Sequence, residues 1–287
     1  MIRSIPLTIA ALLAISLPAE AQQPHAPRDL RGEAAALNSA GEVCETAGQS
    51  AKALGLYRQA LPLVRAVGDR LREANILSNI GESYSYAGQP RKALSYYRQA
   101  LSIVRAANQG AMQAAVLSNI GEVYVHKGRF QEALKYYQQA LALARGSAEE
   151  EGYALSSIGQ IYSSTGRPQK ALGYFQQALP LTRAAEDRML EASTLDDTGQ
   201  VYLQTSRFQK ALTYYGQALL LRRALGNKAA EGVTLANIGV AYARMGQTRK
   251  ALDTLQQSLP LARATGDKVA VATILINIHA LRQKSIR

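Results

Sequence analysis

A unit of about 40 residues recurs through most of the 287-residue chain. Each copy carries a glycine at an equivalent position and an alanine twelve residues later, as in Gly81 and Ala93. The equivalent glycines are separated by 40, 40, 38, 40 and 40 residues and are Gly41, Gly81, Gly121, Gly159, Gly199 and Gly239. Self-similarity at such a period is typical of stacked arrays, in which each unit buries its apolar face against its neighbours. We therefore expect a solenoid.

The apolar residues of one unit recur at helical spacing. Leu77, Ile80 and Tyr84 are three and four residues apart, which places them on one face of a helix. A second set with the same spacing follows the glycine and consists of Ala93, Tyr97, Ala100 and Val104. Each unit is therefore predicted to form two amphipathic helices joined by a turn.

Small residues recur where the two helices of a unit face each other. Gly81, Ala93 and Ala100 are the examples in the second unit. A glycine inside a helix costs about 1 kcal/mol relative to alanine, so its recurrence at six equivalent positions needs a packing reason. We expect the helices to approach closely there, with Tyr84 and Tyr97 filling the space that the small residues leave.

Capping and proline residues mark the expected helix boundaries. Pro90 and Pro168 stand at the start of second helices, where a missing N–H does no harm. Four residues that precede first helices are predicted N-caps, namely Asp69, Asn108, Asn227 and Asp267. Three prolines fall inside second helices and predict a kink or an early end there, namely Pro62, Pro180 and Pro260.

The repeat resembles a known family. The residues that stand in the order and spacing of a tetratricopeptide repeat are Leu77, Ile80, Gly81, Tyr84, Ala93, Tyr97 and Ala100. The unit is longer than the usual repeat of about 34 residues, and Leu77 stands where the family commonly has tryptophan. The long form is similar to the repeats of kinesin light chains and of bacterial tandem-repeat proteins. This resemblance, over residues 30–284, implies an all-α, right-handed α-solenoid of about six helix–turn–helix units plus a C-terminal capping helix.

The N-terminus differs in character from the repeats. Arg3 precedes an apolar run over residues 5–17, and Ala19-Glu20-Ala21 has the pattern of a cleavage site. We interpret residues 1–21 as a signal peptide cleaved after Ala21, the alternative being an uncleaved anchor. Residues 22–28 then form a disordered linker, and residues 29–287 form the solenoid domain. The signal predicts a bacterial protein that is periplasmic or secreted, without stable membrane insertion after cleavage.

The chain is basic, with a formal net charge of +12. Its lysine and arginine residues are scattered over second helices and turns, and no nucleic-acid-binding signature accompanies them, so we expect no nucleic acid partner. We interpret the charge as a solvated convex surface, the alternative being attraction to an anionic cell surface. Cys44 is the one cysteine, which excludes an intramolecular disulfide. Because it occupies the position of Tyr84 in the next unit, we expect a buried thiol.

Two stretches depart from the regular repeat. Residues 146–151 lack two residues relative to the other units and include three consecutive glutamates, which predicts a tightened turn before an acidic first helical turn. At the C-terminus only a first helix follows Asp267. Its apolar residues either stay partly exposed and support self-association or close onto the sixth unit, and we favour closure; they are Ile274, Leu275, Ile278 and Leu281.

No catalytic arrangement emerges from the sequence. His25, His126 and His279 lie far apart and have no partner at a metal-ligand spacing. No nucleophile elbow or phosphate-binding loop is present. We therefore expect no enzyme activity, no metal and no cofactor.

The resemblance directs attention to the concave groove, which first helices line in this family. Carried over by position, it predicts groove residues in the second and third units, and asparagine or aspartate equivalents farther on: Ser78, Asn79, Glu82, Tyr86, Ser118, Asn119, Glu122, His126, Asp197, Asn237 and Asn277. The asparagines resemble the ladder that grips a peptide backbone in long-repeat relatives, since an amide both donates and accepts. The alternative is that Asn79 and its equivalents bond neighbouring helices.

The sequence thus predicts a non-catalytic scaffold that binds a protein or peptide, one with basic character because Glu82 and Glu122 face the groove. Two other functions stay open: a regulatory partner of a separate enzyme, and a scaffold that associates with itself through its last helix.

Overall fold

The computed structural model describes residues 29–285, which form thirteen α-helices and no strands. The predicted signal peptide and linker lie outside the described residues. The helices are α1 (Leu30–Thr46), α2 (Ser50–Ala66), α3 (Arg70–Tyr86), α4 (Pro90–Ala106), α5 (Gly110–His126), α6 (Phe130–Leu143), α7 (Ala148–Ser164), α8 (Pro168–Ala184), α9 (Arg188–Gln204), α10 (Phe208–Ala224), α11 (Lys228–Arg244), α12 (Thr248–Ala264) and α13 (Lys268–Ser285).

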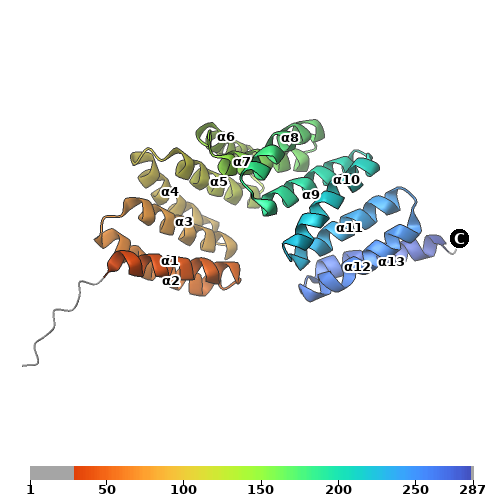
Figure 1. The fold of residues 1–287 in the computed structure, drawn as a ribbon, viewed down its shortest axis with the longest axis horizontal. Helices are drawn as coiled ribbons and strands as arrows, with labels where there is room; N and C mark the ends of the chain where they lie inside the picture. The colour runs from red at the N-terminus through yellow and green to blue at the C-terminus, as the bar shows by residue number, and fades with distance from the viewer. Residues whose placement is uncertain (1–28, 286–287) are drawn as a thin grey trace, which may run out of the picture.

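The helices stack in pairs along an arc (Figure 1), so the predicted all-α solenoid of six helical hairpins and a closing helix is confirmed. Each odd-numbered helix contacts the next odd-numbered helix, from α1 through α13. Among the described helices the even-numbered ones do not contact one another. The first helices of the repeats therefore line the inner, concave side, and the second helices form the outer side.

The predicted N-caps hold with one exception. The side chains of Asp69 and Asn227 accept hydrogen bonds from backbone N–H groups of their helices, as N-caps do, and Asp267 accepts from Val269 and Ala270. The prediction for Asn108 is wrong, because it takes a left-handed conformation (φ 53°) in the turn and Gln109 precedes the helix.

The internal prolines do not shorten their helices, so of the two predicted effects, a kink or an early end, the early end is excluded. The helices that contain Pro62, Pro180 and Pro260 each span 17 residues, as does α4, whose interior has no proline. Pro90 and Pro168 occupy the first helical position as predicted.

Five of the six equivalent glycines admit an aromatic ring between the two helices of a repeat, and Gly239 admits Leu255 instead. A Cβ added at Gly81 would lie 2.7 Å from Cε1 of Tyr97, and one at Gly159 would lie 2.5 Å from Cε1 of Phe175. The close approach predicted at these glycines is confirmed. Tyr84 does not fill this space; it stacks on Tyr96, with ring centroids 5.5 Å apart.

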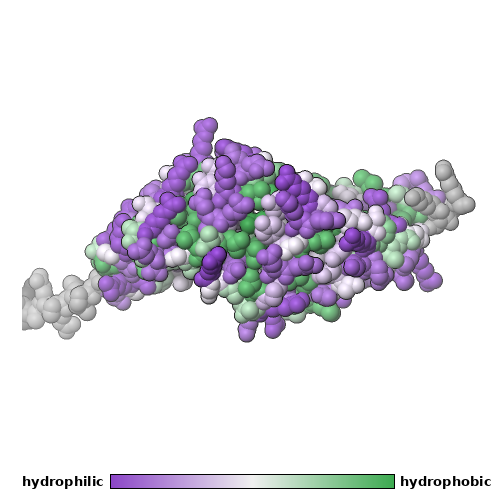
Figure 2. Space-filling model, turned by 90° about the horizontal axis from the view of Figure 1, so that it is seen from above, coloured by the Kyte–Doolittle hydropathy of each residue, from purple (hydrophilic) through white to green (hydrophobic). Residues whose placement is uncertain are grey.

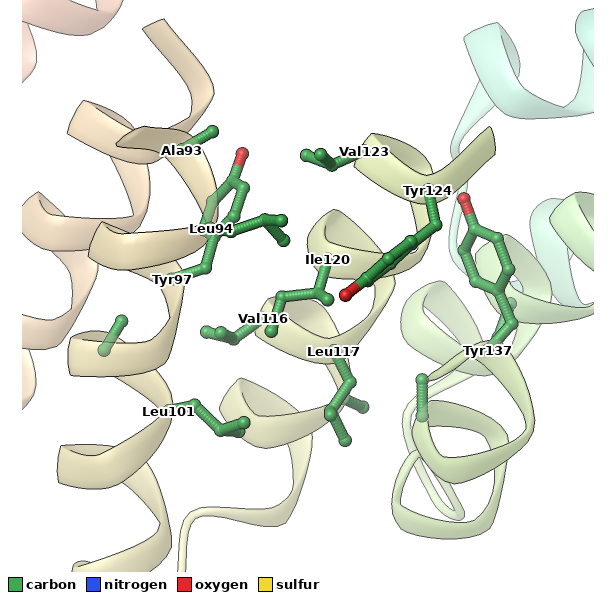
Figure 3. Packing of buried hydrophobic residues seen from close by; sticks show 14 of the residues in the cluster. Ala93, Leu94, Tyr97, Leu101, Val116, Leu117, Ile120, Val123, Tyr124 and Tyr137 are labelled. Carbon is green, nitrogen blue, oxygen red and sulfur yellow. The ribbon is translucent and has the colours of Figure 1, made fainter. Parts of the chain in front are cut away.

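Neighbouring repeats share an apolar core. Figure 3 shows Leu94 and Tyr97 of α4 facing Val116 and Ile120 of α5, and all four are buried. A polar contact adds to this packing at the repeat junctions. An arginine near the end of a second helix binds a glutamate eight residues later, in the next first helix, in the pairs Arg65–Glu73, Arg183–Glu191 and Arg223–Glu231.

The irregular stretches behave differently from one another. Helix α6 ends at Leu143 after 14 residues, and residues 144–147 form a turn one residue longer than its equivalents, so the predicted tightened turn is wrong: the missing residues are lost from the end of α6. Ser147 caps α7, whose first turn contains Glu149, Glu150 and Glu151 as predicted. Cys44 is only partly buried, so the prediction of a buried thiol is wrong: it lies at the rim of the first repeat, where no earlier repeat among the described residues covers it.

The last helix closes the solenoid. Ile274, Ile278 and Leu281 are buried against Leu255 of α12, whereas Leu275 stays exposed. Closure onto the sixth repeat is thus confirmed for three of the four apolar residues. Seen from above the arc, the molecule has a mostly hydrophilic surface interrupted by narrow apolar strips (Figure 2). No helix within residues 29–285 is long and apolar enough to cross a membrane.

Candidate functional site

The concave side is hollowed in the middle of the arc. A cavity of about 550 Å³, here called the central pocket, opens between α5, α7 and α9. Its polar lining includes Glu122, His126, Tyr153, Ser157, Gln160 and Asp197. A second hollow of about 410 Å³ lies between α1 and α3 and is lined by Asn38, Ser39, Arg72 and Asn75.

The lining residues occupy equivalent positions in successive first helices. Counted from the recurrent glycine, they stand nine, six and two residues before it and one and five residues after it, as Leu190, Ser193, Asp197, Gln200 and Gln204 do in α9. These intervals of three and four residues mark one helical face. The same five positions in every first helix are called the groove positions below.

A row of carboxylates follows the N-terminal half of the groove. Glu42, Glu82 and Glu122 occupy the position after the glycine in the first three repeats. Burial raises the pKa of the Glu82 carboxyl, the hydroxyl of Tyr86 opposes this by donating a hydrogen bond of 2.9 Å, and the charges of Glu122 and Glu42 raise the pKa further. Bringing a cation into this row would relieve the mutual repulsion of the carboxylates.

Glu122 marks the edge of the central pocket. The hydroxyl of Tyr153 donates to its Oε2 at 3.3 Å, and Nε2 of His126 lies 3.6 Å from its Oε1. Asp197, from α9, accepts a hydrogen bond of 2.7 Å from Nε2 of Gln160. The central pocket therefore carries two carboxylates from different helices, each with one fixed donor.

The amide side chains in the groove link neighbouring repeats. Nδ2 of Asn79 donates to Oδ1 of Asn38 at 3.0 Å and to Oε1 of Glu42 at 3.3 Å, both in the preceding first helix. Gln160 and Asp197 make the equivalent bridge between α7 and α9. The alternative interpretation of the ladder, that these residues bond neighbouring helices, holds for Asn79 and Asp197.

Two predicted groove residues point into the repeat junction instead. The hydroxyl oxygens of Ser78 and Ser118 are buried without a hydrogen-bond partner in the described part of the chain, and Ser118 is only 1% exposed. Ser156, their equivalent in α7, pairs with Thr194 of the next repeat at 2.5 Å. Across the junctions from Ser78 and Ser118, the position of Thr194 is taken by Val116 and Ala154, which offer no side-chain hydrogen-bonding group. Ser118 is not accessible to a ligand in the groove.

The other predicted residues all lie at groove positions of first helices. Tyr86 and His126 are exposed, and the remainder are half-buried: Asn79, Glu82, Asn119, Glu122, Asp197, Asn237 and Asn277. The structure brings Glu122, His126 and Asp197 together around the central pocket. Asn237 and Asn277 belong to α11 and α13, at the other end of the groove.

The sequence reasoning missed a contribution from second helices. Tyr137 of α6 lines the central pocket, and the hydroxyl of Tyr215 donates to Oε1 of Gln200 in α9 at 2.9 Å. Each ring crosses its repeat beside the recurrent glycine and carries a phenol to the groove floor. The sequence signal that could have revealed this contribution is the tyrosine that recurs sixteen residues after the glycine.

Among residues 29–285, no group of histidine, cysteine, aspartate and glutamate side chains is placed to hold a metal ion. The groove is instead a surface of carboxylates, amides and hydroxyls, which suits hydrogen bonding and charge pairing with an extended ligand.

Comparison with protein families agrees with this architecture. The tetratricopeptide repeat family matches residues 32–106, 112–184, 153–224 and 190–264. The chain belongs to the tetratricopeptide repeat family. No curated protein matches its sequence.

Solved structures of other tetratricopeptide repeat proteins superpose on the chain. The apo quorum sensor NprR from B. thuringiensis has a TM-score of 0.72 and 18% identity, over 90% of this chain and 73% of that one. A Rap protein complexed with Competence and Sporulation Factor has a TM-score of 0.65 and 16% identity, over 88% and 75%.

A STAND signal transduction ATPase with a tetratricopeptide repeat sensor, from Pyrococcus horikoshii, has a TM-score of 0.71 and 23% identity over 89% of this chain. The chain spans only 39% of the length of that protein. At these identities the likenesses concern the fold alone.

Proposed function

We propose that the chain is a scaffold that binds a protein or peptide segment in its concave groove, in the periplasm or outside the cell. The observation that carries the proposal is the groove itself, in which polar side chains from several repeats converge on the central pocket. An extended peptide exposes alternating donors and acceptors, and the half-buried amides and carboxylates offer complementary groups.

The carboxylate row favours a ligand with basic character. Glu42, Glu82 and Glu122 bring three negative charges to the groove of a chain whose overall charge is +12. Opposite potentials across an interface steer association and suppress wrong partners. Two proteins of similar fold, the quorum sensor NprR and a Rap protein in complex with Competence and Sporulation Factor, support a ligand-binding role for such a solenoid.

The location outside the cytoplasm rests on the sequence of residues 1–21. A positive charge, an apolar run and an Ala-x-Ala pattern together favour export and cleavage after Ala21. The N-terminal sequence of the protein isolated from the periplasm tests this point. A chain that begins at Gln22 supports the proposal, and one that retains Met1 contradicts it.

A pull-down from envelope extract tests the binding function. The bait is the chain from Gln22, compared with a Glu82→Gln, Glu122→Gln variant that loses two groove charges. The matched control is Glu186→Gln, Asp253→Asn, which removes two exposed charges outside the groove positions. We expect a partner recovered by wild type and control to be lost with the groove variant, because charge pairing with the ligand is removed.

If all three baits recover the same proteins, binding does not use the groove. Circular dichroism of each bait verifies that the helices are intact.

A second candidate function is the regulation of a separate enzyme. The similarity to the repeat-containing sensor ATPase favours it, since a solenoid alone could act on such an enzyme as a partner. Recovery of an enzyme or signalling protein as the groove-dependent partner would support this function.

A further inference from the structure

The chemistry of the groove positions changes along the solenoid. Directly after the glycine, the first three repeats have glutamate, the next two have glutamine, and the sixth has Val240. Six residues before the glycine, polar Ser193 in repeat five is followed by Val233 in repeat six. At the position directly after the glycine, the groove thus changes from acidic in the first three repeats to apolar in the sixth.

The apolar end is accessible to a ligand. Val233 is 58% exposed, and Val240 is half-buried. Both belong to α11 and lie at positions whose equivalents in α7 and α9 line the central pocket. Exposed apolar side chains in a concave surface are typical of binding sites.

The charge also changes sign at this end. Arg244, which is exposed, takes the groove position that Tyr86, His126 and Gln204 occupy in earlier repeats. No glutamate or aspartate stands at any groove position of α11 or among the described side chains at those of α13. Arg72, at a groove position of repeat two, is paired with Asp69 at 3.0 Å. A lysine or arginine of a ligand is therefore attracted to the carboxylate row of the first three repeats and repelled by Arg244 in repeat six.

We propose that the groove takes a two-part peptide segment, with its basic residues over the first three repeats and an apolar stretch over Val233 and Val240. This inference rests on the proposed function and specifies its ligand. Charge complementarity selects the basic part, and burial of the two valines favours an apolar part over a second basic one. This change in chemistry along the groove determines which end of the ligand lies on which repeats.

Binding of two synthetic peptides tests the proposal. One has a lysine-rich block followed by a block rich in leucine and alanine; the other, of equal length, is lysine-rich throughout. Fluorescence anisotropy measures their affinity for the chain from Gln22. We expect the two-block peptide to bind about tenfold more tightly, the equivalent of one well-buried apolar contact.

Substitutions in the groove test the contributions of its acidic end and its apolar end to binding separately. Val233→Ser, Val240→Ser should weaken the two-block peptide several-fold and leave the lysine-rich peptide unchanged. Glu82→Gln, Glu122→Gln should weaken both peptides and reduce the salt dependence of binding. Arg244→Glu should strengthen the lysine-rich peptide in particular. Leu220→Ser, an exposed apolar residue on the outer helix α10, is the control for loss of apolar surface.

Photo-crosslinking decides the orientation. A crosslinker within the lysine-rich block should label α3 or α5, and one within the apolar block should label α11. Labelling in the opposite order overturns the proposal.

Failure of the inference differs from failure of the proposed function. If both peptides bind equally and only the glutamate variant weakens them, the groove binds basic peptides without an apolar end, and the inference is wrong. If neither peptide binds and the pull-down finds no groove-dependent partner, the proposed function is wrong. If Val233 and Val240 are instead covered by a second copy, size-exclusion chromatography shows a dimer that the valine variant dissociates, and this too overturns the inference.

Discussion

At the scale of single residues, the recurrent glycine determines how tightly each repeat packs. In repeat four, Phe175 is fully buried with its ring against Gly159, in space that a side chain would occupy. The intrinsic cost of glycine in a helix, about 1 kcal/mol, is offset by this contact. In the repeats where the ring belongs to tyrosine, the same glycine also lets a phenol reach the groove.

Gly159→Ala should therefore destabilise the protein even though alanine is the better helix former. The added methyl group would overlap the ring of Phe175, which has no free space to move into, and such overpacking costs about 1–3 kcal/mol. The measurement is the free energy of unfolding in urea.

Gly173→Ala in the same repeat is the matched control. Nothing lies within 4 Å of a Cβ added there, so this variant should gain up to about 1 kcal/mol from helix propensity alone. Equal effects of the two substitutions would show that packing at Gly159 is not the reason for its glycine.

At the scale of elements, ion pairs hold the end of one repeat to the start of the next. The side chain of Glu231 is only 8% exposed and binds both Arg223 and Lys228 at 2.9 Å. Hydrogen bonds from Lys228 and Arg223 hold the pKa of the Glu231 carboxyl below its usual range. Glu73 in repeat two likewise binds two cations, Arg65 and Arg70, and Glu191 in repeat five binds Arg183.

The junction between repeats two and three lacks this pair. Arg105 stands in the arginine position, but Gln113 replaces the glutamate and donates to the carbonyl of Val104 at 3.4 Å. Gln113→Glu should restore the ion pair and stabilise the protein by about 0.5 kcal/mol, as partly exposed pairs do. Thermal unfolding at low salt measures the gain.

The arginine provides the control for this substitution. In an Arg105→Gln background, Gln113→Glu should bring no gain, because the new carboxylate has lost its partner. A gain of the same size in both backgrounds would assign the effect to the helix dipole rather than to the pair.

At the scale of the whole molecule, stability is distributed repeat by repeat. Each helix contacts its neighbours along the arc and no distant part of the described chain. Stability in such arrays is approximately a sum of repeat and nearest-neighbour terms. A destabilising substitution at one end should therefore lower the stability of the nearby repeats only.

Ile278→Asp tests this locality. Ile278 is buried between α13 and α12, and a charge there should detach the last helix and expose Leu255. We expect amide hydrogen exchange to accelerate in α11, α12 and α13 and to stay unchanged in α3 and α4.

Ile276→Asp on the same helix is the control, because Ile276 is 67% exposed and its replacement should change exchange little. If hydrogen exchange accelerates uniformly through all repeats in the Ile278→Asp variant, stability is not a sum of repeat and neighbour terms, and the solenoid unfolds as a single cooperative unit.

The sequence alone determined the fold and the number of units. A period of 40 residues and helical spacing within it leave little choice, because each amphipathic helix pair needs a copy of itself on both sides to bury its apolar faces. It also determined the close contact at Gly81 and Gly159 and the capping by Asp69 and Asn227, whereas it left closure of α13 as the favoured one of two alternatives, which the structure decided. These features depend on local spacing and residue type.

Only the tertiary structure decided which of the predicted polar side chains are accessible in the groove and which residues they bind. Asn79 and Asp197 have partners about 40 residues away, and the buried hydroxyl of Ser118 has no hydrogen-bond partner among the described residues because Ala154 stands across the junction where Thr194 stands one repeat later. Periodicity gives the face of a helix, but not the rotation of that face against the next repeat. That rotation is set by the packing of whole side chains at each junction, and it turns equivalent positions into a bridge in one repeat and a buried residue in another.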